Sequence, residues 1–164
     1  MDEADNLKLI NITSAYKKEW ESYIKEIKDA GEEFVPAGLY YEGKTFEEML
    51  KINDGYSKGI CYNPSYVGAD TYWLVREIDN KLIGAINLRH ELNDYLLNYG
   101  GHIGYGIRPS ERGKGYATLM LNLCVPKIKK MGINKFLVTC DESNIGSQKV
   151  IKKKMLLKYA IGYL

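Results

Sequence analysis

The sequence is poor in the residues that mark disulfide-bonded, metal-binding and nucleic-acid-binding proteins. Its 164 residues contain three cysteines, Cys61, Cys124 and Cys140. An odd number of widely spaced cysteines fits neither a disulfide framework nor a zinc site, so we expect a reduced, cytoplasmic protein without a metal. Lys plus Arg (23) exceeds Asp plus Glu (21) by only two, so the global charge does not indicate a nucleic-acid partner.

Long apolar runs are missing as well. No run approaches the roughly 20 residues that span a bilayer, so no membrane partner is expected. The N-terminal sequence MDEADNLK lacks the basic-then-apolar order of a signal peptide. Apolar residues make up 45% and charged residues 27% of the chain, which is ordinary for a globular protein. The length therefore predicts a single domain over residues 1–164 with a core of its own.

Apolar periodicity and turn residues predict the elements of the first half. These are a strand over 7–12, a helix over 15–29 and a second helix over 46–52. Thr45 and Glu48 have the spacing of a capping box before the second helix. The segment 53–70, rich in glycine and tyrosine, is expected to be a long loop. It is either a lid or wall over a substrate pocket, or a surface loop held to the core by its tyrosines.

The second half predicts an antiparallel meander that changes to a parallel crossover. Strands over 71–78 and 81–89 are joined through Asp79-Asn80, a strong hairpin turn, and a third strand covers 101–107. The later elements are a helix over 114–131, a buried strand over 134–140 and a helix over 145–157 capped by Asn144 or Ser143. A strand, helix and strand in succession form a right-handed crossover, so strands 101–107 and 134–140 should be parallel neighbours. The fold class is α+β (mixed α/β), with a mostly antiparallel mixed sheet and helices on both faces.

The stretch Gly101–Thr118, GHIGYGIRPSERGKGYAT, predicts an anion-binding site. A glycine-rich strand is followed by a basic glycine turn and a helix, whose first amides and dipole attract negative charge. Gly113 and Gly115 have no Cβ to obstruct phosphate oxygens and can adopt positive φ angles. Arg112 and Lys114 add positive charge. Gly104 and Gly106 within the strand predict a bulge or a close backbone approach.

Two other phosphate-binding motifs do not fit this stretch. A P-loop requires a glycine at the position of Arg108 and a hydroxyl residue at the position of Gly115. A dinucleotide fingerprint places Pro109 or Thr118 where its third glycine belongs.

What does match is Arg112-Gly113-Lys114-Gly115-Tyr116-Ala117, which resembles the Arg/Gln-x-x-Gly-x-Gly/Ala signature of the GNAT superfamily of acyl-CoA-dependent N-acyltransferases. Residues 104–109 resemble the fourth strand of that family and its exit. Residues 141–147 resemble its second motif, in which an asparagine opens the last helix. The order of the predicted elements is also similar, so the resemblance extends from about residue 7 to 151.

The resemblance implies a function and a set of binding residues. The protein would move an acetyl group from acetyl-CoA to a primary amine of an unidentified small molecule, by direct attack in a ternary complex. The glycine turn would hold the pyrophosphate, and the pantetheine arm would lie where strand 101–107 splays from strand 134–140. The positions assigned to the cosubstrate are Ile107, Arg112, Gly113, Lys114, Gly115, Tyr116, Ala117, Thr118, Asn144 and Ser147.

Three residues are candidates for the general base. Acylation needs a neutral amine, and a substrate ammonium with a pKa of about 10 must first lose its proton. His102 lies on strand 101–107, and His90 and Glu91 follow the neighbouring strand, so they can reach the mouth of the cleft. Either histidine can equally be a hydrogen-bonded structural residue. No cysteine has an adjacent basic partner in sequence, which disfavours an acyl-cysteine route.

The sequence departs from the family pattern in its last part. Many members have a tyrosine that protonates the leaving thiolate seven residues after the motif asparagine, and here that residue is Ile151. The C-terminal strands are expected to be shortened or missing, with room for one short strand over 159–163. An uncovered sheet edge invites pairing, which predicts a homodimer. The alternative function is an acyl-CoA-binding protein with little or no transferase activity.

Two further groups of side chains leave alternatives open. Four loop tyrosines suggest an aromatic pocket for a cation. They are Tyr40, Tyr41, Tyr62 and Tyr66. The lysines at 149, 152, 153, 154 and 158 form the solvated side of the last helix, or they face an anionic partner or the 3′-phosphate of CoA.

Overall fold

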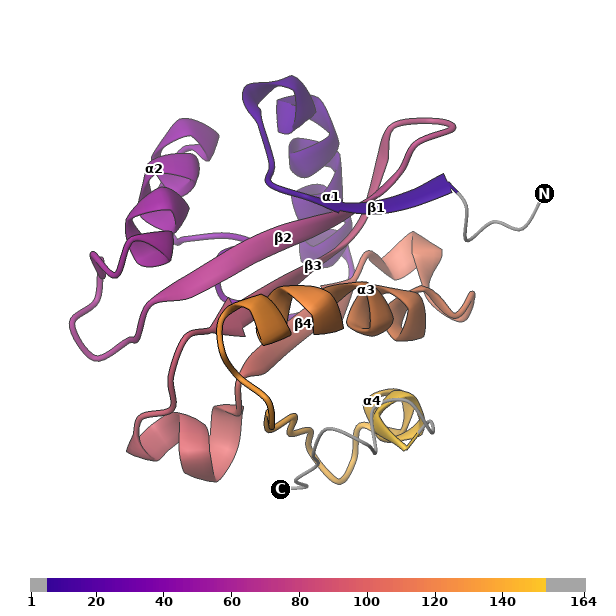
Figure 1. The fold of residues 1–164 in the computed structure, drawn as a ribbon. Helices are drawn as coiled ribbons and strands as arrows, with labels where there is room; N and C mark the ends of the chain where they lie inside the picture. The colour runs from indigo at the N-terminus through magenta and orange to yellow at the C-terminus, as the bar shows by residue number, and fades with distance from the viewer. Residues whose placement is uncertain (1–5, 153–164) are drawn as a thin grey trace.

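The computed structural model describes residues 6–152 and contains a four-stranded sheet with helices on both faces (Figure 1). The strands are β1 (Leu7–Ile10), β2 (Ala69–Arg76), β3 (Lys81–Arg89) and β4 (Ile103–Ile107). They pair in the order β1-β2-β3-β4, and every pairing is antiparallel. The helices are α1 (Lys17–Asp29), α2 (Phe46–Ser57), α3 (Tyr116–Lys130) and α4 (Ile145–Ile151). The short turns are η2 (Ser14–Tyr16), the π-helical η3 (Leu96–Gly100) and η4 (Pro109–Glu111).

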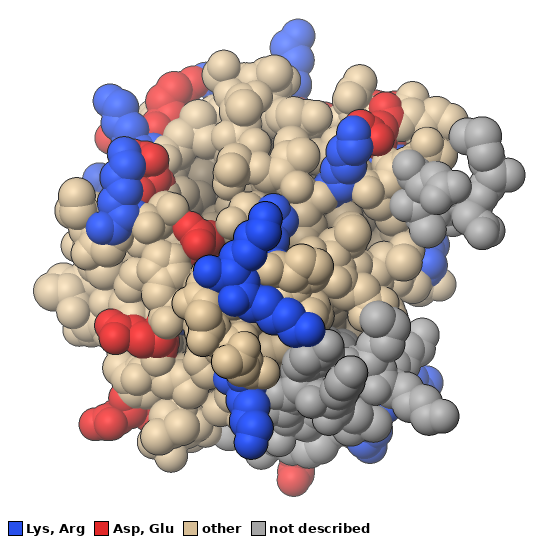
Figure 2. Space-filling view, viewed as in Figure 1, with Lys and Arg blue, Asp and Glu red and all other residues tan. Residues whose placement is uncertain are grey.

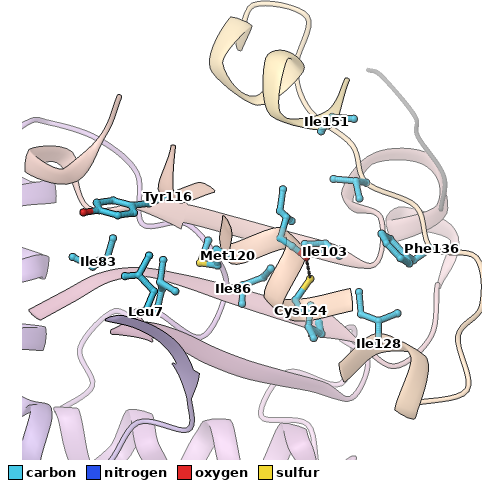
Figure 3. Packing of buried hydrophobic residues seen from close by; sticks show 14 residues of the cluster. Leu7, Ile83, Ile86, Ile103, Tyr116, Met120, Cys124, Ile128, Phe136 and Ile151 are labelled. Atoms are coloured by element: carbon cyan, nitrogen blue, oxygen red, sulfur yellow. Dashed lines mark hydrogen bonds between the residues drawn. The ribbon is translucent and has the colours of Figure 1, made fainter. Parts of the chain in front are cut away.

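The two faces of the sheet bury separate apolar clusters because side chains alternate along each strand. On one face, Trp73 and Ala85 pack with Trp20 and Ile24 of α1 and with Phe46 of α2. The opposite face carries the larger cluster against α3. In Figure 3 its residues from the sheet, from α3 and from α4 converge. The labelled members include Ile83, Ile86, Met120, Cys124 and Ile151.

Helix α2 begins as the sequence predicts but continues further. The capping box is confirmed, because Thr45 Oγ1 accepts from the Glu48 amide at 3.2 Å and Glu48 Oε2 accepts from the Thr45 amide at 2.8 Å. The prediction that the loop starts at residue 53 is wrong, since the helix extends to Ser57. Two of its last residues have inward contacts: Asn53 donates to the Gly38 carbonyl at 2.8 Å, and Tyr56 is buried. These contacts outweigh the weak helix propensity of the segment.

The predicted hairpin is confirmed between β2 and β3. Its turn includes Asn80 with a φ of 51°, a conformation that asparagine tolerates better than most residues. The register of the pair shifts between Leu74 and Val75, which pair with Gly84 and Leu82, so the extra residue of this irregularity, Ile83, lies in β3.

The strand predicted over 134–140 is wrong, and with it the extended parallel pair. Only Ile103 and Val138 form a parallel bridge. Beside it, the His102 amide donates to the Leu137 carbonyl at 2.8 Å, but the Leu137 amide donates to the imidazole Nδ1 of His102 at 2.9 Å. A side chain has therefore taken the donor that a continued ladder would use. From Gly104 to Ile107, β4 is the outer strand of the described sheet.

Helix α3 covers the face of the sheet seen in Figure 1. Its last turn carries Lys127, Lys129 and Lys130, and Figure 2 shows basic side chains gathered over this part of the molecule. Cations there complement the negative end of the helix dipole. Among residues 6–152, no helix combines the length and the apolar character that crossing a bilayer requires. The last part of the helix predicted over 145–157 lies outside the described residues, and so does the whole strand predicted over 159–163.

Candidate active site

A cleft of about 660 Å³ lies along the outer edge of β4. Its walls come from the loop after α1, from the glycine turn with the start of α3, and from the start of α4. It gathers most of the residues that the sequence assigns to the cosubstrate: Ile107, Arg112, Gly113, Gly115, Tyr116, Ala117, Thr118, Asn144 and Ser147. The exception is Lys114. Segments about 30 residues apart in sequence thus meet at one site.

The glycine turn presents a row of free amides to this cleft. Gly113 and Gly115 have φ angles of 75° and 84°, which glycine adopts without strain. Within the described chain, no group accepts a hydrogen bond from the amides of residues 113–118. A Cβ on either glycine would meet no atom within 4 Å and would extend into open space. The turn therefore leaves room for an anion beside unsatisfied donors.

Both cations of the turn already have carboxylate partners. Arg112 forms a bidentate pair with Glu32 from the loop after α1, at 2.8 and 2.7 Å. Lys114 donates to the buried Glu111 at 3.0 Å, and Lys114 does not line the cleft. Burial alone raises the pKa of Glu111, but hydrogen bonds from Lys81, Arg76 and Lys114 outweigh it and lower the pKa to about 2. The attraction for an anion therefore comes mainly from the amides.

The two glycines of β4 are sites of close approach. A Cβ on Gly106 would lie 2.4 Å from the Val35 carbonyl oxygen, and one on Gly104 would lie 2.8 Å from Nη2 of Arg89. The expectation of a close backbone approach is therefore confirmed at Gly106, whereas Gly104 is approached by a side chain. Tyr23 Oη also donates to the Gly106 carbonyl, at 3.3 Å. The loop after α1 and the end of β3 thus contact the middle of β4.

Tyr105 is the aromatic side chain of β4 that lines the cleft. It packs against the α3 cluster, and its hydroxyl lies close to Ser147 of α4. Burial raises the pKa of Tyr105, so the hydroxyl keeps its proton at neutral pH. Asn144 caps α4 by accepting from the Ser147 amide at 3.0 Å, which confirms the predicted cap. Ile151 is fully buried in the core, so the position of the family's tyrosine holds no polar group.

The three candidate bases lie near the ends of β3 and β4, and none of them lines the cleft. His90 Nε2 is 3.1 Å from Asp70 Oδ2. His102 accepts the Leu137 amide through Nδ1, and burial together with the charge of Arg89 lowers its pKa, so it is neutral. Glu91 is exposed. Their role as a base stays a prediction.

A second cavity, of about 440 Å³, lies beside the cleft. Its lining comes from the loop before α2, from α2, from the segment leading into β2, from the end of β3 and from the segment leading into η3: Ala37, Tyr41, Tyr56, Ser65, Tyr66, Val67, Ala69, Asn87, Arg89, Asn93, Tyr95 and Leu96. Tyr41 and Tyr66 of the predicted aromatic pocket are present, whereas Tyr40 and Tyr62 are not. Val35 lines the cleft and Ala37 lines this cavity, so a single short segment separates them.

Comparison with known protein families decides the assignment. A family model for the acetyltransferase (GNAT) domain matches residues 32–154, which is most of the chain. The chain belongs to the GNAT acetyltransferase family. The matched range includes the glycine turn, both glycines of β4 and the start of α4, so the GNAT signature found in the sequence coincides with the cleft.

Solved structures agree in fold. A ribosomal-protein-S5-alanine acetyltransferase from Vibrio fischeri is 15% identical, with a TM-score of 0.59, and the match covers 89% of this chain and 76% of that one. A putative GNAT-family acetyltransferase from Bordetella pertussis is 13% identical, with a TM-score of 0.57, and the match covers 91% of this chain and 83% of that one. The microcin C7 self-immunity acetyltransferase MccE, in complex with acetyl-CoA and AMP, is 16% identical, with a TM-score of 0.56. That match covers 92% of this chain and 78% of the other. A comparison with curated proteins finds no match.

Sequence reasoning missed several residues of the site. Arg89, Glu32 and Glu33 contribute to the two cavities but belong to no motif, and Tyr105 lies within the family-like strand 104–109 without being singled out for its side chain. In the sequence, nothing distinguishes the tyrosine and the glutamates of this group from the other tyrosines and carboxylates of the chain. Within the described residues, no group of three or more His, Cys, Asp or Glu side chains is arranged to hold a metal ion.

Proposed function

We propose that this GNAT protein transfers an acetyl group from acetyl-CoA to a primary amine of a small molecule, by direct attack within a ternary complex. One observation carries the proposal: a cleft with a row of free amides and a separate aromatic cavity lie on either side of the short segment from Val35 to Ala37. A direct transfer requires two such compartments, because donor and acceptor must be held at the same time with their reacting atoms in contact.

The hydrogen-bond donors of the cleft support acetyl-CoA as the acetyl donor. The amides of residues 113–118 would bind the pyrophosphate, and a side chain on Gly113 or Gly115 would occupy the same space. Arg112 and Lys149 lie at this end and would add positive charge. The outer edge of β4 offers backbone groups to the amide-rich pantetheine arm. An amide near Ile107 would stabilise the negative charge that develops on the thioester oxygen.

Tyr105 is the side chain that we propose as proton donor to the departing thiolate. It lines the cleft on β4, and its raised pKa keeps it protonated at neutral pH. Ile151 has no proton to give. A covalent route through cysteine has little support, because the thiolate is disfavoured at both cysteines. Burial raises the pKa of Cys124 to about 12, and burial together with the negative charge of Asp141 raises the pKa of Cys140. The cysteines are free thiols, which suits a reduced, cytoplasmic compartment.

The acceptor amine must lose its proton before it attacks. His90, His102 and Glu91 remain the predicted bases. The Leu137 amide occupies the Nδ1 lone pair of His102, which favours His90 of the two histidines. Its contact with Asp70 would orient the ring and stabilise the imidazolium that forms.

An acyl-CoA-binding protein with little or no transferase activity is the second candidate. The observation in its favour is Ile151, which is buried at the position where many family members carry the acid. Both candidates predict CoA binding, so binding alone does not separate them.

A thiol-release assay with acetyl-CoA across a panel of primary amines separates the two functions. The transferase predicts amine-dependent release of CoA and an acetylated product detected by mass spectrometry. Calorimetric binding of CoA, without turnover on any amine, supports the binding protein instead. If neither binding nor turnover occurs, both proposals are wrong.

A further inference from the structure

The arginines of this protein differ in one respect. The chain has four, and three of them have carboxylate partners within 3.0 Å. These three are Arg76, Arg108 and Arg112. Arg89 has no carboxylate partner within the described part of the chain. Its Nη1 donates to the carbonyls of Gly100 and Gly101, at 3.1 and 3.3 Å. Its Nε and Nη2 have no acceptor among residues 6–152.

Arg89 is nevertheless well enclosed. It lines the aromatic cavity, and its guanidinium lies over Gly104, where a Cβ would come within 2.8 Å of Nη2. Burial lowers the pKa of Arg89 to about 10, so the side chain remains charged at neutral pH. The ionisable side chains that interact electrostatically with it are Tyr66, Tyr95 and His102, and none of them is a carboxylate. An enclosed cation without a counter-ion is unfavourable, which indicates that the counter-ion comes from a ligand.

We propose that Arg89 binds the carboxylate of the acceptor, and that the acceptor is a small amino acid-like molecule with its primary amine close to that carboxylate. This inference rests on the proposed transferase function and names the substrate class. The free Nε and Nη2 edge of a guanidinium matches the two oxygens of a carboxylate. No Asp or Glu lines the cavity, so nothing there competes with the ligand.

The position of Arg89 relative to β4 limits the distance between amine and carboxylate. Its guanidinium lies over Gly104, and Gly106 is two residues further along the strand, about 7 Å away. The thioester is expected beside residues 105–107. A carboxylate held at Arg89 therefore places an amine on the same or the neighbouring carbon near the acetyl group. A longer amine would extend past it.

The remaining wall indicates what else the acceptor carries. Tyr41, Tyr56, Tyr66 and Tyr95 with Leu96 form an apolar and aromatic surface, so an apolar or aromatic side chain would be buried there. The same cavity is unsuited to a polyamine or another cationic acceptor. Its tyrosines alone would favour a cation, but Arg89 would repel it.

The test compares acceptors that share an amine and a side chain but differ in the carboxylate. Phenylalanine, phenylalaninamide and phenethylamine form one set, and leucine with leucinamide forms a second. The measured quantity is kcat/KM, corrected for the fraction of neutral amine. We expect the carboxylate to raise it by roughly 10- to 100-fold, the range of a hydrogen-bonded charge pair. Equal or better turnover of the amines without a carboxylate would overturn the proposal.

Two variants of Arg89 locate the effect. Arg89→Met keeps most of the side-chain length without the charge and should abolish the preference for the carboxylate, through KM more than kcat. Arg89→Lys keeps the charge without the bidentate geometry of the guanidinium and should restore part of the preference for the carboxylate. Both should bind CoA as the wild type does, since Arg89 does not line the cleft. If Arg89→Met retains the preference, the carboxylate binds elsewhere. Should that variant not fold, the comparison of acceptors on the wild type still decides.

A binding measurement separates this inference from the proposed function. Calorimetry with N-acetylphenylalanine and N-acetylphenylalaninamide, in the presence of CoA, requires no turnover. Tighter binding of the carboxylate by wild type, lost in Arg89→Met, would support the anion site even if no amine is acetylated, and then only the transferase proposal fails. Turnover of amines together with equal binding of the two probes would leave the transferase standing and refute the site at Arg89.

Discussion

The guanidinium of Arg112 and the carboxylate of Glu32 form two parallel hydrogen bonds, of 2.8 and 2.7 Å, between two walls of the cleft proposed to bind CoA. Arg112 also donates through Nε to the Ile107 carbonyl at 3.0 Å. The cation that the GNAT signature brings to the turn is thus already paired. An incoming pyrophosphate must share Arg112 with Glu32 or displace it.

Removing this competitor should strengthen CoA binding. Glu32→Gln frees Arg112 without changing the size of the side chain, and an exposed ion pair is worth up to about 1 kcal/mol, so we expect roughly two- to fivefold tighter binding by calorimetry. Glu33→Gln is the matched control, because Glu33 lines the same cleft without an ion pair among the described residues. The comparison removes the general effect of one fewer negative charge. Weaker binding in Glu32→Gln alone would mean that Glu32 positions Arg112 for the ligand.

The free amides of the glycine turn predict a strong effect at Gly115. Gly115→Glu places bulk and negative charge where the pyrophosphate would lie, so CoA binding should be lost. Gly132→Glu is a matched control at the other end of α3. Its φ of 81° and its open surroundings resemble those of Gly115, so the backbone strain is similar while the cleft is unchanged. Unchanged CoA affinity in Gly115→Glu would refute the placement of the site.

The hydroxyl of Tyr105 predicts a defect in chemistry without a defect in binding. Tyr105→Phe removes the proposed acid and should lower kcat by about 100-fold or more, the lower end of the effect of a general acid, while CoA affinity stays near that of the wild type. Tyr72→Phe is the control, because burial also raises the pKa of Tyr72, on the same face of the sheet but outside the cleft. A kcat of Tyr105→Phe equal to that of the control would assign the proton to solvent.

Most of the fold follows from local sequence signals. The capping box at Thr45 and the hairpin at Asp79-Asn80 depend on residues a few positions apart, and both are confirmed. The strand over 134–140 shows where such signals end. Its apolar residues correctly predict burial, since Phe136 and Val138 are both buried. An apolar pattern does not predict strand pairing, however, and here the His102 imidazole accepts from the Leu137 amide, which a continued ladder would need as a donor.

The site divides in the same way. The glycine turn is one continuous motif, so its place at the cleft could be predicted from sequence. Arg89 gains its significance from the absence of carboxylates in a cavity built by five separate segments, and no sequence pattern encodes an absence. The predicted homodimer depends on the sheet edge near the C-terminus, outside the described residues. It stays a prediction, and a monomer by light scattering would contradict it.

Glu111 links the glycine turn to the sheet and predicts how stability depends on pH. Its carboxylate receives Arg76 and Lys114 at 3.0 Å and Lys81 at 2.8 Å, and its pKa is about 2 in the folded protein. A pKa below its unfolded value means that the folded state favours the ionised form. The stabilisation is therefore complete above about pH 5 and is lost as the pH falls towards 2, by about 3 kcal/mol in all.

Glu111→Gln should remove this dependence and also lower stability at neutral pH, because three cations lose their common partner. Chemical denaturation between pH 2 and 7 measures both effects on the free energy of unfolding. Glu47→Gln is the control, since it breaks an exposed pair with Lys17 and should change the profile little. CoA affinity gives a further readout, because Lys114 released from Glu111 lies within the turn and should bind phosphate more strongly. Identical pH profiles for Glu111→Gln and the wild type would show that the acid sensitivity of the fold arises elsewhere.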